Sequence, residues 1–369
     1  MNTYKVIGLM SGTSLDGLDI AYCSLTPPST PLRKGSPKER AALKWKYKII
    51  VAETIKYSSH WKAKLDSLTT ATAYELALIH SEYGHYIGKQ VKRFIDKNKI
   101  KADFISSHGH TVFHQPNNRM TFQIGSGAAI AAECSLPVVC DFRTMDVALG
   151  GQGAPLVPIG DQLLFPDYDS CLNLGGFANI SFEQNKKQVA FDICPVNIIL
   201  NTLSLKIDQE YDNKGNTARS GKVNTALLKE LNNLSYYKKS GNKPKSLGKE
   251  WVIENIFPIL KKYNLGVNDM LRTFNEHIAI QIKNTFDKKG HKKILVTGGG
   301  TYNDFLIETI RAHTSHQLII PDKKIIDFKE ALIFALLGVL RIREEINSLS
   351  SVTGASQNSA GGCIYYHKK

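Results

Sequence analysis

The 369-residue chain is poor in cysteine and has no long hydrophobic run. Its six cysteines include no CxxC pair, so neither a disulfide framework nor a cysteine-based zinc site is expected. No stretch approaches the ~18 consecutive apolar residues of a membrane helix. The first residues also lack the basic region, apolar core and cleavage site of a secretory signal. These absences predict a cytoplasmic protein of a reducing compartment, without a membrane partner.

Two common nucleotide-binding motifs are missing as well. Without GxxxxGK[ST] the chain is not a P-loop enzyme, and without GxGxxG opening a helix Rossmann-type dinucleotide binding is not expected. The net charge is +14, much of it in residues 33–46 and 288–293. Neither run carries an aromatic stacking platform, so we predict solvated loops and helix ends and no nucleic-acid partner. A basic surface also suits an anionic substrate.

Strand-like and helix-like segments alternate, which predicts an α/β fold. Strands are expected at residues 4–10, 18–25, 47–54, 102–107, 136–142, 170–174, 180–182, 188–193 and 292–296. Helices are expected at residues 71–97, 127–133, 196–206, 249–262, 268–287, 304–313 and 327–347. Residues 26–40 are rich in Pro, Ser and Lys and are predicted to be a surface insertion.

Each half of the chain begins with a strand, a glycine-rich turn and a second strand. This weak repeat indicates either a duplicated fold or two unrelated α/β domains. We predict an N-terminal lobe of residues 1–145, on which residues 346–369 pack back, and a C-terminal lobe of residues 146–345. Gly150, Gly151 and Gly153 are expected to form the crossing between them.

Three glycine-bearing turns follow predicted strands, at residues 12–17, 175–179 and 298–301. Glycine allows a close backbone approach, and successive N–H groups form an anion-binding nest. One such turn is typical of a tight hairpin, whereas three predict a site for nucleotide phosphates. The carboxylates of Asp16 and Asp19 suit Mg²⁺. The expected nucleotide-binding residues are Gly12, Thr13, Ser14, Leu15, Asp16, Gly17, Leu18, Asp19, Gly175, Gly176, Asn179, Gly298, Gly299 and Gly300.

Six ordered motifs make the chain resemble the anhydro-N-acetylmuramic acid kinases, within the larger group of sugar kinases, hexokinase, actin and Hsp70. They are GLMSGTSLDGLD at residues 8–19, HGHTVFHQP at 108–116, QIGSGAAIA at 123–131, DFRTMDVALGGQGAPLVP at 141–158, NLGGFANISF at 173–182 and TGGGTYN at 297–303. The resemblance implies a two-lobed, duplicated actin-like ATPase (ribonuclease H-like) fold with the ligand cleft between the lobes.

The resemblance also implies the reaction. ATP and Mg²⁺ would serve phosphorylation of 1,6-anhydro-N-acetylmuramic acid, whose anhydro bridge is opened by water to give N-acetylmuramic acid 6-phosphate. Cell-wall recycling in the cytoplasm and a homodimer are implied too. A kinase for another sugar hydroxyl and a non-catalytic actin-like ATP-binding protein are the alternatives.

Asp192 ends a predicted strand beside the second glycine turn. By its spacing alone, its carboxylate suits a general base or the N-cap of the following helix. The resemblance favours the base. The family's usual DTGPxN is DICPVN here, with Ile193 and Cys194 in place of threonine and glycine. Cys194 is expected to serve packing.

The expected sugar-side residues are His110, Thr111, Arg143, Asp146 and Glu330. The HGHTVFH segment could be a histidine metal site, but polar contacts to a sugar fit better, because Mg²⁺ prefers oxygen. The family usually has glutamine in place of His110. Arg143 suits the substrate carboxylate or an interlobe salt bridge. Glu330 is either a helix-start carboxylate or, as the resemblance suggests, a sugar contact.

Overall fold

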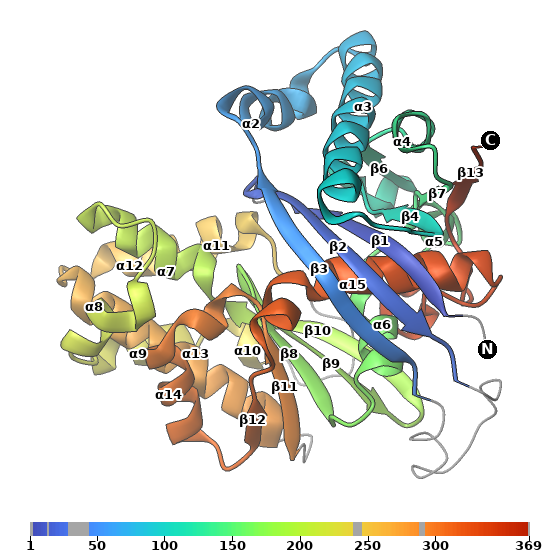
Figure 1. Ribbon diagram of the computed structural model, residues 1–369. Helices are drawn as coiled ribbons and strands as arrows, with labels where there is room; N and C mark the ends of the chain where they lie inside the picture. Colours follow the sequence, from blue (N-terminus) through green and yellow to red (C-terminus); the bar gives the residue numbers. More distant parts are fainter. Residues whose placement is uncertain (1–2, 13–14, 29–43, 239–245, 288–291, 368–369) are drawn as a thin grey trace. The chain divides into compact units, whose positions relative to one another are not determined.

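The structure, a computed structural model, describes residues 3–12, 15–28, 44–238, 246–287 and 292–367 (Figure 1). Two compact units make up the chain: unit 1 is Met1–Asp167 with Phe328–Lys369, and unit 2 is Tyr168–Asp327. Residues 29–40 of the expected insertion, the greater part of both basic runs, Thr13 and Ser14 lie outside the described residues.

In unit 1, the described residues form a six-stranded sheet in the order β13-β7-β4-β1-β2-β3. The strands are β1 (Tyr4–Ser11), β2 (Gly17–Thr26), β3 (Lys46–Lys56), β4 (Phe104–Ser107), β7 (Val138–Cys140) and β13 (Cys363–Tyr365). Strands β1, β2 and β3 are antiparallel neighbours, whereas β4 runs parallel to β1 and to β7. The C-terminal strand β13 adds to the edge of β7.

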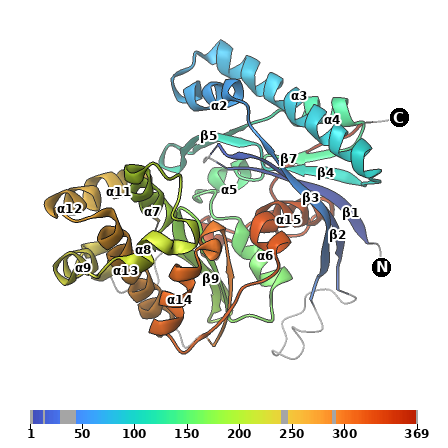
Figure 2. The same ribbon diagram turned by 60° about the vertical axis from the view of Figure 1, so that its left-hand side comes forward.

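Both faces of this sheet are covered by helices. Ile7 and Leu9 of β1 pack into the core that α3 (Ala73–Asn98) closes, and a capping box of Thr72 and Glu75 begins that helix. On the other face α15 (Lys323–Ile342) comes so close that a Cβ on Gly8 would lie 2.0 Å from the carbonyl oxygen of Ala331. Glycine at this position is therefore a packing requirement. Figure 2 shows α3 and α15 from a second side.

Smaller elements complete unit 1. A two-stranded sheet of β5 (His110–Gln115) and β6 (Met120–Ile124) follows β4. The remaining helices are α2 (Ser59–Asp66), η1 (Ser67–Thr70), η2 (Pro116–Asn118), α4 (Gly127–Cys134), α5 (Thr144–Ala148), α6 (Val157–Leu164) and α16 (Ser350–Thr353).

Unit 2 contains a five-stranded sheet in the order β10-β9-β8-β11-β12 among the described residues. Its strands are β8 (Ser170–Leu174), β9 (Phe177–Gln184), β10 (Lys187–Pro195), β11 (Lys293–Thr297) and β12 (Gln317–Ile319). Its helices are α7 (Asn197–Ser204), η3 (Leu205–Ile207), η4 (Asn213–Gly215), α8 (Asn216–Ser220), α9 (Thr225–Asn232), α10 (Ser235–Lys238), α11 (Lys249–Asn255), α12 (Phe257–Lys262), α13 (Val267–Asp287), η5 (Gly299–Tyr302) and α14 (Asp304–His313). Leu172, Leu174 and Val296 of this sheet pack in one apolar core with α7, α13 and α14.

The two units repeat one strand order. Three antiparallel strands, β3-β2-β1 or β10-β9-β8, are extended on the side of the first strand by parallel neighbours, β4-β7 or β11-β12. This agreement confirms the duplicated α/β fold and removes the alternative of two unrelated domains.

The divisions between the units lie elsewhere than the sequence indicated. Residues 146–167 and 328–345 belong to unit 1, because α6 and the greater part of α15 pack there. The buried Asp161 of α6 and Lys329 of α15 form an ion pair of 2.7 Å. The turn at Gly150–Gly153 is internal to unit 1, and the chain passes between the units after Asp167 and after Asp327.

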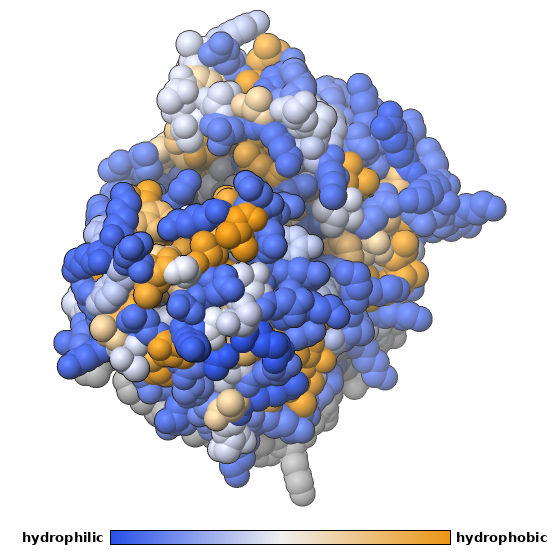
Figure 3. All heavy atoms as spheres, turned by 90° about the vertical axis from the view of Figure 1, so that its left-hand side faces the viewer, coloured by the Kyte–Doolittle hydropathy of each residue, from blue (hydrophilic) through white to orange (hydrophobic). Residues whose placement is uncertain are grey.

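No helix of the described residues is long and apolar enough to cross a membrane. The face shown in Figure 3 is mainly hydrophilic, with small apolar patches among the polar residues. Scattered apolar residues are ordinary on a protein surface.

Candidate active site

The first glycine turn joins β1 to β2 in unit 1. Among its described residues the positive φ, 57°, falls on Leu15 and not on Gly12 or Gly17, where the sequence predicted it. The N–H of Leu15 donates to the carbonyl of Gly12 over 3.4 Å. A Cβ on Gly17 would lie 2.6 Å from the carbonyl oxygen of Ile55. The Leu18 side chain is buried in the core, so only its backbone can face a ligand.

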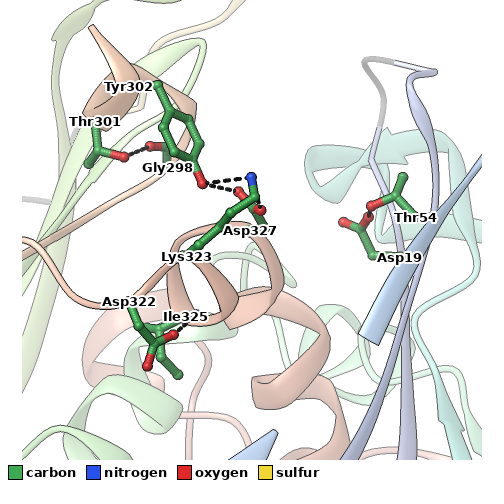
Figure 4. A network of polar contacts seen from close by, with 9 residues as sticks. All are labelled: Asp19, Thr54, Gly298, Thr301, Tyr302, Asp322, Lys323, Ile325 and Asp327. Carbon is green, nitrogen blue, oxygen red and sulfur yellow. Dashed lines mark hydrogen bonds and ion pairs between the residues drawn. The ribbon is translucent and has the colours of Figure 1, made fainter. Parts of the chain in front are cut away.

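Two carboxylates follow this turn. Asp16 is exposed, and Oδ1 of Asp19 accepts a hydrogen bond of 2.5 Å from Oγ1 of Thr54 on the next strand (Figure 4). Among the described residues no cluster of three or more His, Cys, Asp or Glu side chains could hold a metal ion. The histidine metal site considered for residues 108–114 is therefore not formed by these residues.

In unit 1 His108 contacts Arg143, one of the residues expected to bind the sugar. Nδ1 of His108 lies 2.9 Å from the carbonyl oxygen of Gly109, and Nε of Arg143 donates to Nε2 of His108 over 3.0 Å. Because the carbonyl only accepts and the guanidinium only donates, His108 is a neutral ring protonated on Nδ1. Nη1 of Arg143 donates to the carbonyl of Gly153 over 2.6 Å. The guanidinium is thus held on two sides.

The charge environment of Arg143 is set by burial and two carboxylates. Burial lowers the pKa of Arg143 to about 10, while Glu330 and Asp146 act in the opposite direction. Part of the Glu330 side chain is exposed. The protein around its carboxyl group nevertheless raises the pKa of Glu330 by desolvation, whereas the positive charges of Lys329 and Arg143 lower it. An arginine so placed keeps its charge and can form a bidentate pair with a carboxylate.

Asp146 accepts three hydrogen bonds from protein donors. Its Oδ1 accepts from Ser348 Oγ and Thr353 Oγ1, each over 2.7 Å, and its Oδ2 accepts from the N–H of Gly153 over 2.8 Å. The side chain is 1% exposed. This carboxylate therefore fixes the 150–153 turn to residues near the C-terminus, and through Gly153 it supports Arg143.

His110 and Thr111 lie at the start of β5. Nδ1 of His110 is 3.1 Å from Oγ of Ser11, the last residue of β1, and the ring is 4% exposed. Oγ1 of Thr111 accepts a long hydrogen bond of 3.4 Å from Gln123 of β6. The structure thus places His110 directly beside the residue that precedes the first glycine turn.

In unit 2 the second and third glycine turns are neighbours, because β8 and β11 are parallel and both turns follow their carboxyl ends. The carbonyl of Gly176 accepts the N–H of Val196 over 2.8 Å, which ties the second turn to the start of α7. Gly298 has a φ of +90°, and Thr301 Oγ1 donates to its carbonyl over 2.6 Å (Figure 4). The two turns can therefore serve one ligand.

Asn173 lies between these turns. A Cβ on Gly298 would lie 2.6 Å from Asn173 Oδ1, and a Cβ on Gly175 would lie 3.2 Å from Asn173 Nδ2. Gly299 and Gly176 have more room: the nearest atom to a Cβ is 3.8 Å away at the former, and none lies within 4 Å at the latter.

Asp192 lies on β10, where the strand bulges before Cys194. Its Oδ2 accepts the N–H of Leu247 over 2.8 Å, and its carbonyl accepts from the hydroxyl of Tyr236 over 2.6 Å. Burial raises the pKa of Asp192 to about 6, partly offset by the Leu247 hydrogen bond. Among the described residues, no hydrogen bond to Oδ1 is found. Cys194 is fully buried, in agreement with a packing role.

The register places Asp192 at the end of a polar row. Thr297 pairs with Asn173, Asn173 with Asn179, and Asn179 with Asp192. Directly opposed residues share one face of a sheet with ~5 Å between their Cβ atoms. Asn173 and His108 were not among the expected site residues. Their positions in NLGG and HGHT were the available signal, but their contacts depend on strand pairing.

The duplicated α/β fold, the glycine turns and the Asp192 carboxylate are typical of a phosphate-transferring enzyme, a kinase. The family model for anhydro-N-acetylmuramic acid kinase matches residues 4–367. The anhydro-N-acetylmuramic acid kinase of Francisella tularensis subsp. novicida is 34% identical over 99% of this chain and 100% of its own length. That of Sulfurovum sp. is 33% identical over 99% and 100%.

The chain belongs to the anhydro-N-acetylmuramic acid kinase family. Among solved structures, the activator of the 2-hydroxyisocaproyl-CoA dehydratase from Clostridium difficile with bound ADPNP aligns with a TM-score of 0.44 and 12% identity, over 90% of this chain and 93% of that one.

Proposed function

We propose that this protein uses ATP and water to convert 1,6-anhydro-N-acetylmuramic acid into N-acetylmuramic acid 6-phosphate and ADP. Family membership supports the substrate and the reaction. The observation that carries the chemistry is Asp192: a carboxylate with one oxygen held by Leu247 N–H and the other without a described partner. Its raised pKa of about 6 suits a general base near neutral pH.

In the proposed step Asp192 takes a proton from water as the water oxygen bonds to the anomeric carbon. The bond between that carbon and O6 breaks, and O6 accepts the γ-phosphoryl group while ADP leaves. The alternative role of Asp192 as a helix N-cap finds no support, since α7 begins at Asn197 and its N-cap residue is Val196.

The residues of unit 1 are assigned to binding and orienting the sugar. Arg143, held by His108 and Gly153, would pair with the lactyl carboxylate of the sugar. Glu330, His110 and Thr111 would contact its polar groups. Asp146 has three protein donors, so we assign it a supporting role toward Arg143 in place of direct sugar contact.

The glycine turns of both units would bind the phosphates of ATP through backbone N–H groups. This role falls to residues 12–19 in unit 1, and in unit 2 to Gly175, Gly176, Asn179 and Gly298–Gly300. Asp16 and Asp19 offer the oxygen ligands that Mg²⁺ prefers, and bound Mg²⁺ would neutralise phosphate charge. A homodimer and a cytoplasmic location remain proposals that rest on the family resemblance.

The test is ADP release with and without the anhydro sugar, run in ¹⁸O-labelled water. Sugar-dependent ADP release with one labelled oxygen at C1 of the product is expected. ADP release stimulated equally by other sugars would favour a different sugar hydroxyl, and ATP binding without release would favour a non-catalytic protein. Either result would overturn the proposal.

A further inference from the structure

A buried chain of hydroxyl groups in unit 1 ends on His110. The hydroxyls of Tyr57 and Tyr83 lie 2.5 Å apart, and Tyr57 donates to Ser11 Oγ over 2.8 Å. Ser11 Oγ in turn lies 3.1 Å from Nδ1 of His110. All four side chains are at least nine-tenths buried. They come from β1, the residue after β3, α3 and β5, so the contacts join four elements.

The donors along this chain can be assigned in order. Tyr57 has one hydroxyl proton, and it goes to Ser11, so the Tyr57 oxygen is the acceptor for Tyr83. A serine oxygen can accept two hydrogen bonds, so the bond from Tyr57 alone does not fix the direction of the Ser11–His110 contact. We assign the Ser11 proton to His110 Nδ1, because each hydroxyl of the chain then donates once. A ring nitrogen that accepts carries no proton. The neutral His110 ring therefore carries its proton on Nε2.

Burial keeps the ring in this neutral form. Desolvation lowers the pKa of His110 to about 4. A second proton would have to sit on Nδ1, which already accepts from Ser11, and every hydroxyl in the chain would have to turn around. At neutral pH His110 is thus an uncharged donor at Nε2, and no described residue accepts from it.

His108, two residues earlier, is arranged in the opposite way. Its Nδ1 donates to the carbonyl of Gly109, and its Nε2 accepts from Arg143. Both of its nitrogens are used by the protein, whereas His110 keeps one N–H available. The two histidines of one short motif therefore carry opposite tautomers for different tasks.

We propose that Ser11, Tyr57 and Tyr83 are positioning residues that fix His110 as an Nε2–H donor to an uncharged oxygen of the sugar. This inference rests on the proposed function for the identity of the ligand. The hydroxyl chain also links the strand that leads into the first glycine turn with the start of β5. A neutral donor adds selectivity for a hydroxyl, ether or amide oxygen, while the anionic group is left to Arg143.

The tautomers can be measured without any activity assay. Two-bond ¹H–¹⁵N correlation spectra of the full chain labelled with ¹⁵N-histidine distinguish the two nitrogens of each ring. His110 is expected as the Nε2–H tautomer and His108 as the Nδ1–H tautomer, with His110→Gln and His108→Gln giving the assignments. In Tyr57→Phe the ¹H–¹⁵N signals of His110 are expected to shift toward those of a mixture of the two tautomers. A wild-type His110 protonated on Nδ1 overturns the proposal.

The kinetic arm uses Tyr57→Phe and Ser11→Ala, with Tyr86→Phe as the matched control. Tyr86 stacks on Tyr83 of the same helix at 6.1 Å, but its hydroxyl is no part of the chain. The two test variants are expected to raise KM for the anhydro sugar about two- to tenfold, with kcat and the KM for ATP little changed. His110→Gln, whose amide can still donate, is expected to bind the sugar better than His110→Ala.

The outcomes are separable. The expected tautomer with an unchanged sugar KM in both variants overturns the assignment of His110 as substrate donor. An equal KM rise in Tyr86→Phe also overturns it, because the effect is then general to the tyrosine cluster. Absence of sugar-dependent ADP release in the wild-type protein refutes the proposed function instead, a result that the spectra do not affect.

Discussion

Each unit has three residues in register across its first three strands, near the glycine turn. The two rows differ in the hydrogen bonds of the one carboxylate that each contains. One position in from the end of each hairpin, unit 1 has Met10, Asp19 and Thr54 in register, and unit 2 has Asn173, Asn179 and Asp192. In unit 1 the carboxylate accepts from its cross-strand neighbour Thr54 over 2.5 Å.

In unit 2 the carboxylate has moved to the third strand. No side-chain hydrogen bond joins the Asp192 carboxylate to Asn179, and one carboxylate oxygen has no partner among the described residues. The duplication thus provides the same row twice. We infer that the unit 1 row serves binding and the unit 2 row serves proton transfer.

The largest expected effect comes from Asp192→Asn. The amide keeps an oxygen for the Leu247 N–H but cannot take a proton, so turnover is expected to fall by roughly 10²–10⁴-fold with the fold and ATP binding retained. Steady-state ADP release, circular dichroism and nucleotide titration measure this. Glu183→Gln, an exposed carboxylate at the far end of β9, is the control and is expected to match wild type. A near wild-type rate in Asp192→Asn would contradict the assignment of proton transfer to the unit 2 row.

Stability depends on a different carboxylate, in unit 1. Lys329→Met would remove the 2.7 Å partner of the buried Asp161 carboxylate, and a loss of about 3–5 kcal/mol in unfolding free energy is expected. Urea unfolding measures this loss. Lys323→Met removes an exposed pair of the same helix and is expected to cost less than about 1 kcal/mol. Equal losses in the two variants would contradict the role of burial.

The third turn allows a comparison within one motif. Gly298→Ala would place a Cβ 2.6 Å from Asn173 at a φ of +90°, so we expect a loss of about 1–3 kcal/mol and weaker ATP binding. Gly299→Ala meets nothing closer than 3.8 Å and is expected to be nearly neutral for stability. Thermal unfolding and nucleotide titration of both variants test this, and similar behaviour of the two would show that crowding at Asn173 is unimportant.

The smallest expected effect is that of Thr54→Val, which removes the hydrogen bond from Thr54 to the Asp19 carboxylate. Loss of one exposed hydrogen bond to Asp19 is expected to cost about 0.5–1 kcal/mol and to raise the KM for ATP a few-fold. Unfolding and ATP-dependent rates measure it. A fall in kcat comparable to that of Asp192→Asn would mean that the unit 1 row shares in proton transfer.

Much of the strand framework was predictable, because glycine turns and apolar runs mark β1, β2, β8, β9 and β11 locally. The β5–β6 hairpin was not recognised, since polar His114 and Gln115 interrupt its alternation. One helix was predicted for residues 249–262, but a second helix begins at Phe257. Pro258 lies in its first turn, where proline is tolerated, whereas it is disfavoured inside a helix.

The site was predictable in its parts and not in its contacts. Asp192, Arg143 and the glycine turns stand in recognisable motifs. The His108–Arg143 bond joins residues 35 positions apart and depends on β4 and β7 lying side by side. The Ser11–Tyr57–His110 chain likewise needs three strands to meet. Sequence spacing carries no signal for such tertiary contacts.

The most direct test of the central claim is the pH dependence of kcat/KM for the anhydro sugar, in wild type and Asp192→Asn. A base acts in its ionised form, and burial raises the pKa of Asp192 to about 6, so activity is expected to fall as the pH is lowered through about 6. The residual activity of Asp192→Asn is expected to lack this acid limb. A wild-type profile that is flat between pH 5 and 7, or the same limb in both proteins, would contradict the assignment of Asp192 as the base.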